Sequence, residues 1–444
     1  MIMTAVHLGM DDIDSPRGGC TTHFASLLVE VLTELGARWL DYPNLIRLNP
    51  NIPYRTRGNG AVTLRFKIKA SAVDKVLPRS NLLLKEYLKE DYPNTNPGMV
   101  IATGEVPADL LDFAKLALWR TVPVALARRL VAKFALPHIV IGNGRGLIGA
   151  LSAVGNQLRQ DHTYEYIAYR SIALTSRARG VDVDSVFKMN QKFGTRLFSN
   201  VDITTRKILI EPHGPDPVIY GIRGETPLDV IKAAKLIQSS QDKERWMVFR
   251  TNQGTGEHLR HRVRLSDIRP YMAAVVEGEV TTKSKIIEGG HVIFRITDDS
   301  TIAECAVYEP TGDFREIATM LTEGDKVSLD VGVRPASRMH GLTLNVEGLE
   351  ILQLTNKPIL ANPICPHCLK RMKSAGKEKG FKCIKCGFKD PQAKKIEIPV
   401  ERQLKVDRYL PPPRAQRHLT RPKDRMDRRN KGIPNSLVDE WHNP

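Results

Sequence analysis

Residues 4–35 read TAVHLGMDDIDSPRGGCTTHFASLLVEVLTEL, and this stretch decides the class of the fold. A short β-prone run at residues 4–9 ends at three acids within residues 11–14, and a glycine turn follows. Residues 22–35 then place apolar side chains at helical spacing, and Gly36 ends the helix. A strand, a polar turn and a helix in this order predict an α/β unit with a functional turn at the end of the strand.

The alternation of strands and helices continues outward from this unit to about residue 260. We expect strands at residues 61–69, 99–103, 138–141, 164–169, 217–223 and 245–250. We expect helices at residues 80–88, 107–119, 147–158 and 227–237. This part of the chain is therefore predicted to be α/β or α+β.

The pattern changes near residue 270 to a series of strands. Five β-prone runs are expected at residues 271–280, 290–297, 301–308, 326–334 and 342–352, with a helix at 313–321. Five strands with a helix between the third and fourth have the order of an OB-fold, a small barrel that often binds oligonucleotides. Any other small antiparallel barrel is the alternative.

Four of the six cysteines form two CxxC pairs near the C-terminus, at Cys365, Cys368, Cys383 and Cys386. Four thiolates at this spacing predict a closed, structural Zn²⁺ site. Two disulfides or free thiols are the alternative.

Charge and hydropathy limit the class of protein. The 444 residues contain 66 Lys and Arg against 49 Asp and Glu, a net charge of +17, which favours a polyanionic partner such as nucleic acid. A basic surface that serves solubility alone is the alternative. No apolar run approaches the ~20 residues of a membrane span, and no basic leader precedes the acids, so we expect a cytoplasmic protein without membrane contact. The tail from residue 393 is basic and proline-rich, and we expect it to be flexible by itself.

The acidic block supports a metal and phosphate site. Carboxylates suit Mg²⁺, which shares its coordination shell with substrate phosphates. If the strand continued, Asp12 and Asp14 would lie on one face. The glycines permit a backbone cradle, and hydroxyls at a helix N-terminus sit where a phosphate is favoured. The candidate residues of the block are Asp11, Asp12, Asp14, Gly18, Gly19, Thr21 and Thr22. Ordinary turn and N-cap chemistry is the alternative.

A second glycine-rich segment, Gly144-x-Gly146-x-x-Gly149, matches the dinucleotide fingerprint after a predicted strand. The acid that this motif needs about 20 residues later is missing, because Tyr169 and Arg170 stand there. Nicotinamide binding is therefore disfavoured. A phosphate or RNA backbone held at the helix N-terminus near Gly144, Arg145 and Gly146 remains open, as does close helix–strand packing.

Taken together, several uncommon motifs resemble the archaeal tRNA(Ile) 2-agmatinylcytidine synthetase (TiaS) family. The motifs are DDIDSPRGGCTTH, GNGRGLIGALSAVG, TYEYIAYR, PHGPDPVIYGIRGE and FRTNQGT, followed by the barrel and the paired cysteines. The resemblance implies a multidomain α+β protein with an N-terminal α/β, kinase-like catalytic domain, a ferredoxin-like domain, an OB-fold β-barrel, a zinc ribbon and a basic C-terminal tail. The boundaries expected for these five parts are 1–145, 146–262, 268–355, 360–392 and 393–444.

The resemblance also implies an activity. Family members join agmatine to C2 of the cytidine at the first anticodon position of tRNA(Ile) CAU, and they consume ATP to AMP and phosphates with Mg²⁺. The product pairs with A, so that the tRNA reads AUA. By this resemblance the three acids hold Mg²⁺ and ATP phosphates, and Thr21 is autophosphorylated. Cytosine O2 is a poor leaving group, so its phosphorylation before amine attack is sensible chemistry. No obligate protein partner is evident.

Two departures from the family pattern limit this transfer of roles. Ile13 stands where the family has Thr, so that position is not expected to be essential. Gly256-Glu257 stands where we expect an acid directly after the glycine and threonine of the last motif. For the cationic ends of agmatine, Asp216 and Glu225 are the candidate carboxylates. A non-enzymatic nucleic-acid-binding protein with an OB-fold and a zinc ribbon is the alternative function, and a ligase for another amine or RNA is a third.

Overall fold

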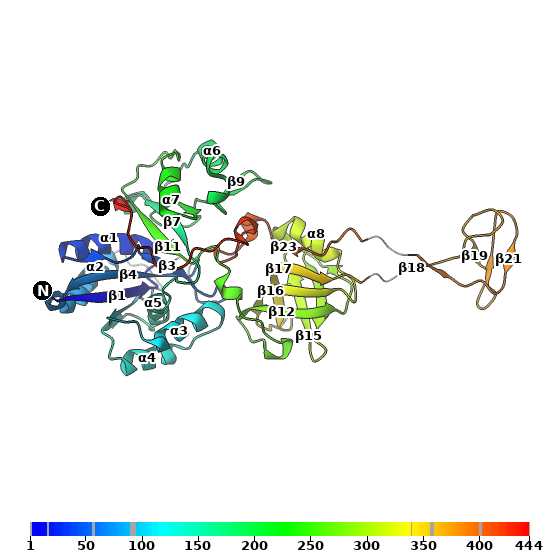
Figure 1. Ribbon diagram of the computed structural model, residues 1–444, viewed down its shortest axis with the longest axis horizontal. Coiled ribbons are helices and arrows are strands. Elements are labelled where there is room, and N and C mark those ends of the chain that lie inside the picture. The colour runs from blue at the N-terminus through cyan, green and yellow to red at the C-terminus, as the bar shows by residue number, and fades with distance from the viewer. Residues whose placement is uncertain are drawn as a thin grey trace.

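The computed structural model describes residues 2–15, 17–55, 58–88, 95–338, 340–355, 359–398 and 402–443. Figure 1 shows a body of helices around one large sheet, then a β-barrel, then a thin extension that ends in a small β-domain. Both labelled chain ends lie in the first body. Among the described residues, no helix has the length and apolar character needed to cross a bilayer.

One ten-stranded sheet organises the first body. Its strands in chain order are β1 (Met3–Asp11), β2 (Arg38–Trp39), β3 (Asn44–Arg47), β4 (Gly60–Lys69), β5 (Gly98–Thr103), β6 (His138–Val140), β7 (Thr163–Tyr169), β10 (Val218–Gly224), β11 (Arg245–Thr251) and β24 (His442–Asn443). The main path through the sheet is β10-β7-β11-β3-β4-β1-β5-β6. The N-terminal strands and the strands after residue 160 therefore belong to one continuous sheet.

The two halves of this sheet meet at β3 and β11, which pair in parallel at Arg250↔Asn44. A buried ion pair reinforces this seam, because Arg250 is fully buried and its Nη2 lies 2.5 Å from Oδ2 of Asp41. Removing one partner of such a pair is costly, since it leaves an uncompensated buried charge.

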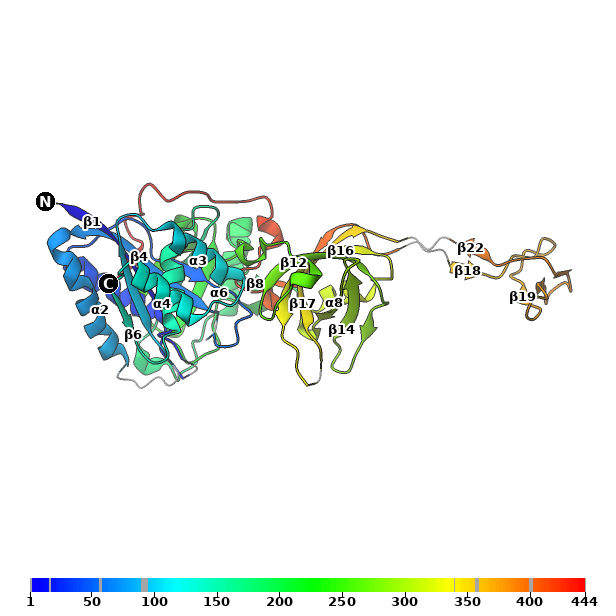
Figure 2. The same ribbon diagram turned by 90° about the horizontal axis from the view of Figure 1, so that it is seen from below.

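Helices cover the sheet, and Figure 2 shows α3 and α4 lying close together over it. They are α1 (Thr21–Glu34), α2 (Val73–Tyr87), α3 (Ala108–Trp119), α4 (Val124–Lys133), α5 (Gly146–Gly155), α6 (Val183–Phe193) and α7 (Pro227–Ala234). The predicted apolar stripe explains α1, because Phe24, Leu28 and Leu32 are fully buried in the core. We did not predict α4 and α6. Each is short, at 10 and 11 residues, and each buries only a narrow face.

The second body is a closed barrel, as expected. Its strands are β12 (Ala273–Val280), β14 (Val292–Thr297), β15 (Ile302–Val307), β16 (Lys326–Arg334) and β17 (Thr343–Gln353), with the short β13 (Lys285–Ile286) beside β14. The order β12-β16-β17-β15-β14 closes through the β12–β14 pairing. Helix α8 (Asp313–Thr319) lies between the third and fourth barrel strands. The OB-fold order read from the sequence is confirmed.

A two-stranded stalk, β18 (Ile359–Ala361) and β22 (Ile396–Ile398), leads to the small distal domain. That domain has three two-residue strands, β19 (Lys373–Ser374), β20 (Phe381–Lys382) and β21 (Lys389–Asp390). Its core consists of Met372, Phe381 and the cysteines. So small a core requires a further crosslink for stability, and the paired cysteines are placed to supply one.

The C-terminal tail, which we expected to be flexible by itself, is held by the other domains. The strand β23 (Arg408–Tyr409) pairs with β17 of the barrel, and β24 pairs with β11 of the large sheet. Between them the chain returns along the first body (Figure 1), and the side chains of Leu419 and Trp441 are buried. Flexibility of the isolated tail stays a prediction, because composition shows only that the tail has no core of its own. It cannot show that other domains provide one.

Candidate active site

A cavity of about 530 Å³ lies where the two halves of the sheet meet the tail. Segments that are far apart in the sequence contribute to its lining. Its polar lining residues are Asp14, Cys20, Thr21, Thr22, Arg47, Glu165, Ser199, Glu211, His213, Asp216, Arg223, Arg414, Gln416, Arg417 and His418. The cavity therefore joins part of the acidic block to residues that only the tertiary structure brings near.

The acidic block begins where β1 stops. The strand ends at Asp11, and Asp12 adopts a left-handed backbone conformation with φ of +59°. The strand does not continue to Asp14, so the condition under which alternation would align Asp12 with Asp14 is not met. The three carboxylates interact electrostatically, but their oxygens do not all lie within 4.8 Å of one another, and Asp14 alone of them lines the cavity.

The carboxylates of the block repel one another. Burial raises the pKa of Asp12 to about 6, and the neighbouring Asp14 adds to the rise while Arg145 opposes it. The pKa of Asp11 is raised well above its usual value, because the protein around it removes water and because Asp12 lies beside it. Two neighbouring acids whose pKa is raised, Asp11 and Asp12, are favourable ligands for a hard cation, which would offset the cost of their burial and relieve their repulsion.

Thr21 and Thr22 lie at the start of α1 and line the cavity. The Thr21 hydroxyl donates a hydrogen bond to Oδ1 of Asp14 over 3.1 Å. The hydroxyl of Thr22 lies 3.1 Å from Sγ of Cys20. A carboxylate that accepts a hydrogen bond from a hydroxyl can also accept its proton when that oxygen attacks, so the contact allows this chemistry at Thr21.

The glycine turn is largely closed on itself. The Ser15 N–H donates to the carbonyl of Gly18 over 2.8 Å, and the Gly18 N–H donates back over 3.3 Å. Gly19 has φ of +73°, which favours glycine at this position. Because the Gly18 N–H is used within the turn, it does not contribute to the backbone cradle that we expected.

The segment of Gly144, Arg145 and Gly146 lies against the acids and does not line the cavity. A Cβ on Gly146 would lie 2.4 Å from the Asn96 carbonyl oxygen, so glycine permits close packing here. Gly144 itself has φ of +86°. Nη2 of Arg145 is 4.0 Å from Oδ2 of Asp12, and this guanidinium also lies over the ring of Tyr54. The helix–strand packing alternative therefore accounts for Gly146, while Arg145 adds positive charge beside the acids.

The two candidate carboxylates for agmatine lie in different places. Asp216 lines the cavity and is almost fully buried, and its Oδ1 lies 3.1 Å from Arg179. Glu225 does not line the cavity. Its carboxylate accepts hydrogen bonds from Arg425 and Asn430 of the tail.

We did not select Glu165, although it belongs to one of the quoted motifs. It is 3% exposed on β7, and Arg47 and Arg223 lie 3.7 and 3.4 Å from its oxygens. The amide of Gln253 donates to it as well. The sequence did contain a signal for this residue, namely a glutamate within an otherwise apolar strand. Such a glutamate is expected to be buried, and a buried acid requires hydrogen-bonding or charged partners.

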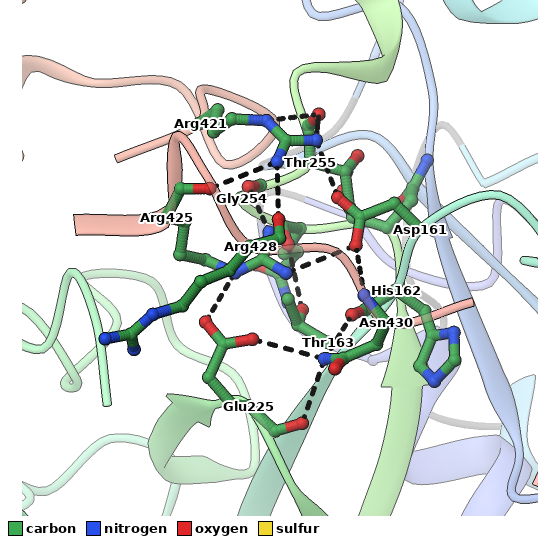
Figure 3. A network of polar contacts seen from close by, with 12 residues as sticks. Asp161, His162, Thr163, Glu225, Gly254, Thr255, Arg421, Arg425, Arg428 and Asn430 are labelled. Carbon is green, nitrogen blue, oxygen red and sulfur yellow. Dashed lines mark hydrogen bonds and ion pairs between the residues drawn. The ribbon is translucent and has the colours of Figure 1, made fainter. Parts of the chain in front are cut away.

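The tail residues of the site had no local signal. Arg414, Gln416, Arg417 and His418 line the cavity, but they come from a proline-rich segment without periodicity. In addition, the basic excess that favoured a polyanionic partner includes Arg421 and Arg425 of this tail. Arg421 and Arg425 instead form ion pairs with Asp161 inside the protein (Figure 3).

The distal cysteines form the expected metal site. The ligand atoms of Cys365, Cys368, Cys383 and Cys386 all lie within 4.8 Å of one another. The closest sulfur pairs are 3.3 and 3.5 Å apart, which is too long for a disulfide and close to the edge of a tetrahedron around zinc.

Three protein-family models match this chain. They are the TiaS TCKD domain over residues 7–142, the TiaS FLD domain over residues 144–258, and the TiaS C-terminal zinc ribbon domain over residues 362–404. The tRNA(Ile2) 2-agmatinylcytidine synthetase TiaS of Staphylothermus marinus is 41% identical, over 99% of this chain and 98% of that protein. This chain belongs to the TiaS family. The TiaS of Pyrococcus horikoshii is 39% identical, over 94% of this chain and 96% of that protein.

Solved TiaS structures share the whole arrangement. The crystal structure of the TiaS–tRNA(Ile2)–ATP complex matches with a TM-score of 0.85 at 37% identity, over 95% of this chain and 97% of that one. The TiaS–tRNA(Ile2)–AMPCPP–agmatine complex matches with a TM-score of 0.83 at 34% identity, over 97% and 99%. The α+β architecture with a barrel and a zinc ribbon is therefore that of the TiaS family.

Proposed function

We propose that this protein is an ATP-dependent ligase that joins agmatine to C2 of the wobble cytidine of tRNA(Ile) with a CAU anticodon. The observation that carries the proposal is the Thr21 hydroxyl, bonded to Asp14 at the wall of a cavity beside two further acids. The names of the relatives, and the TiaS complexes with tRNA(Ile2), ATP and agmatine, support the choice of substrates. With these substrates we infer a cytoplasmic location.

Asp11, Asp12 and Asp14 are the residues that would hold Mg²⁺. Their oxygens are the ligands this ion prefers, and the raised pKa of Asp12 reflects its burial first and the charge of Asp14 second, both of which a cation would offset. When bound, Mg²⁺ neutralises charge on the phosphates of ATP. Arg145, beside Asp12, adds a positive charge on the same side, and Gly144 and Gly146 let its loop approach the acids.

The remaining chemistry follows from the substrate. Cytosine O2 is a poor leaving group, and phosphorylation of that oxygen makes it a good one. The primary amine of agmatine then attacks C2, and phosphate leaves with the oxygen. Thr21, whose proton Asp14 accepts, is the group we propose to be phosphorylated by ATP, with Thr22 next to it.

The cationic end of agmatine requires a carboxylate. We assign it to Asp216, because this residue lines the cavity and Glu225 does not. Glu211, on the same segment, lines the cavity too and is partly exposed. A guanidinium bound at this side of the cavity would place a second positive charge near Asp216, whose carboxylate already pairs with Arg179.

The barrel and the zinc ribbon are proposed to hold the tRNA. Exposed basic residues surround the ribbon's metal site, namely Lys370, Arg371, Lys382 and Lys385. Side chains of this kind contribute affinity through phosphates and fix the register of the RNA without reading its sequence.

The test incubates the protein with ATP, Mg²⁺, agmatine and an unmodified tRNA(Ile) CAU transcript, followed by mass analysis of the anticodon nucleosides. We expect the wobble cytidine to gain the mass of agmatine less water, and AMP to form. A transcript of another tRNA with cytidine at the same position is the control for substrate choice. An unchanged cytidine, with tRNA binding confirmed, would contradict the proposal.

The same reaction separates the alternatives. A non-enzymatic nucleic-acid-binding protein would bind the transcript and produce no AMP. A ligase for another amine would modify cytidine when agmatine is replaced by putrescine, which lacks the guanidinium, at an equal or higher rate. We expect putrescine to react poorly, because it cannot form the paired hydrogen bonds of a guanidinium with a carboxylate.

A further inference from the structure

The tail is fixed next to the active-site cavity by backbone hydrogen bonds. The N–H of Gly254 donates to the carbonyl of His418 over 2.9 Å, and the N–H of Gly256 donates to Leu419 over 2.7 Å. Both glycines have positive φ, in the loop that follows β11. This loop, which belongs to the quoted TNQGT motif, therefore serves as a dock for the tail.

An arginine clamp secures the segment that follows (Figure 3). Arg425 is fully buried, with Nε 2.6 Å from Glu225 and Nη2 3.2 Å from Asp161. Arg421 pairs with the other oxygen of Asp161 at 2.6 Å. The side-chain amide of Asn430 donates a hydrogen bond to the other carboxylate oxygen of Glu225. Two acids of the first body are thus matched by two tail arginines, so the tail has a defined path past the cavity.

A second, smaller cavity of about 210 Å³ results from this path, and we call it the tail cavity. Three arginines line it, Arg47, Arg55 and Arg417, together with Gln416 and His418. Among the described residues no acid lines it. At about 30 Å³ for each water, its volume corresponds to roughly seven waters. The tail cavity is therefore a small positively charged space that is half built by the tail.

Two arginines of the tail cavity, Arg47 and Arg417, keep donor groups without a hydrogen-bond partner among the described residues. Nη2 of Arg47 is 3.7 Å from Glu165, and its buried Nε has no hydrogen-bond partner within the described chain. Arg417 contacts Glu347 through Nε at 3.2 Å, and no other hydrogen bond of its guanidinium is found among the described residues. The pKa of His418 is lowered well below its usual value by the enclosing protein and by Arg47 and Arg223. His418 is thus neutral, and positive charge remains for an anion.

We propose that the tail cavity binds a backbone phosphate of the RNA strand beside the wobble nucleotide, so that the C-terminal tail forms part of the substrate site. This inference rests on the function proposed above. The tail cavity and the main cavity share Arg47, Arg417 and His418, so the two spaces adjoin. A base in the main cavity has a phosphate on each side, and arginine binds phosphate with paired hydrogen bonds.

Phosphate chemistry also occurs in ATP, so the experiment must separate the two sources. The substrate is an anticodon stem-loop RNA in three forms, one unmodified and two with a single uncharged methylphosphonate, 5′ or 3′ of the wobble cytidine. Wild type and Arg417→Gln are compared by KM for RNA, KM for ATP and kcat. Arg129→Gln, an exposed change on α4, is the matched control.

We expect Arg417→Gln to raise the KM for RNA about tenfold, with little change in kcat or in the KM for ATP. One methylphosphonate should have a similar effect on wild type and none on the variant, because both remove the same contact. Arg417→Lys should recover part of the loss. The proposal would be overturned if the effects of Arg417→Gln and of the methylphosphonate on the KM for RNA were additive. It would also be overturned if Arg417→Gln raised only the KM for ATP.

Two controls keep the result decisive. Wild type must first modify the unmodified RNA, and failure at that point contradicts the proposed function and not the tail cavity alone. If Arg417→Gln unfolds, as measured by thermal denaturation, Arg55→Gln takes its place, because Arg55 is exposed and lines the same cavity. If the effects of Arg55→Gln and of each methylphosphonate on the KM for RNA were then simply additive, the inference would be overturned.

Discussion

The acidic block at residues 11–22 and the tail at residues 402–443 reach the same cavity by different physical routes. The block is built locally, since a strand end, a glycine turn and a helix start bring Asp14 and Thr21 together within eight residues. The tail is instead held in place by contacts with distant parts of the chain. Asp161 and Glu225 of the first body determine where the tail arginines lie. A site formed by residues close in the chain can be predicted from the sequence, whereas a site that depends on contacts between distant segments cannot.

The largest expected effect tests the local route. Thr21→Ala removes the hydroxyl that Asp14 binds, and we expect product formation to fall by about 10²–10⁴-fold, the range for loss of one nucleophile or its base. The measurement is single-turnover modification of the anticodon nucleoside. Thr21→Ser, which keeps a hydroxyl, is the matched control and should retain much of the rate. Full activity of Thr21→Ala would remove Thr21 from the mechanism.

The next effect tests the route through partners. Arg425→Met leaves Glu225 without its cation and leaves Asp161 with Arg421 alone, and we expect a loss of about 3–5 kcal/mol in the free energy of unfolding. Urea denaturation measures it. Lys115→Ala removes a pair with Asp112 in which both side chains are mostly exposed, and it should change stability by less than about 1 kcal/mol. Equal effects of the two changes would show that the clamp does not hold the tail.

A pH effect is expected from buried histidines, one of which lies at the start of α1 beside the block. His23, directly after the two threonines, is buried against Tyr87 and Tyr169, and burial together with Arg245 lowers its pKa to about 3. Below pH 6.5 the unfolded chain binds a proton that the folded chain does not. Stability should therefore fall as the pH drops from 6.5 toward 3, with a slope of up to about 1.4 kcal/mol per pH unit.

Urea denaturation at pH 7 and pH 5 measures this slope, and His23→Gln is the control that should reduce it. His7 and His162, whose pKa values are also lowered by burial, to about 4, contribute slopes of the same sign that remain in the variant. An unchanged slope in His23→Gln would show that His23 does not contribute.

The smallest expected effect concerns a third region, the zinc ribbon, which lies far from the first body in Figure 1. Cys383→Ser removes one of the four sulfur ligands, and the ribbon should lose its fold, since so small a core depends on its metal. We expect affinity for the whole tRNA to fall about tenfold through lost phosphate contacts. Modification of a short anticodon stem-loop should be unaffected, and a loss there would place the ribbon in the active site.

Most of the regular structure could be predicted because its signals are local. The stripe of α1, the five barrel strands with α8 and the CxxC spacing each occur within a short window. The helices α4 and α6 were missed because each buries only one narrow face. The domain boundaries and the roles of the site residues stay predictions.

By itself, the sequence determined the acid–threonine block, the barrel and the metal ligands, because residues close in the chain are held together by backbone geometry. The tertiary structure alone decided that Glu165, Arg47 and the tail complete the cavity. The continuous sheet through β3 and β11 brings these segments together, and a buried charge such as Glu165 or Asp161 selects its partner by desolvation wherever that partner lies in the chain.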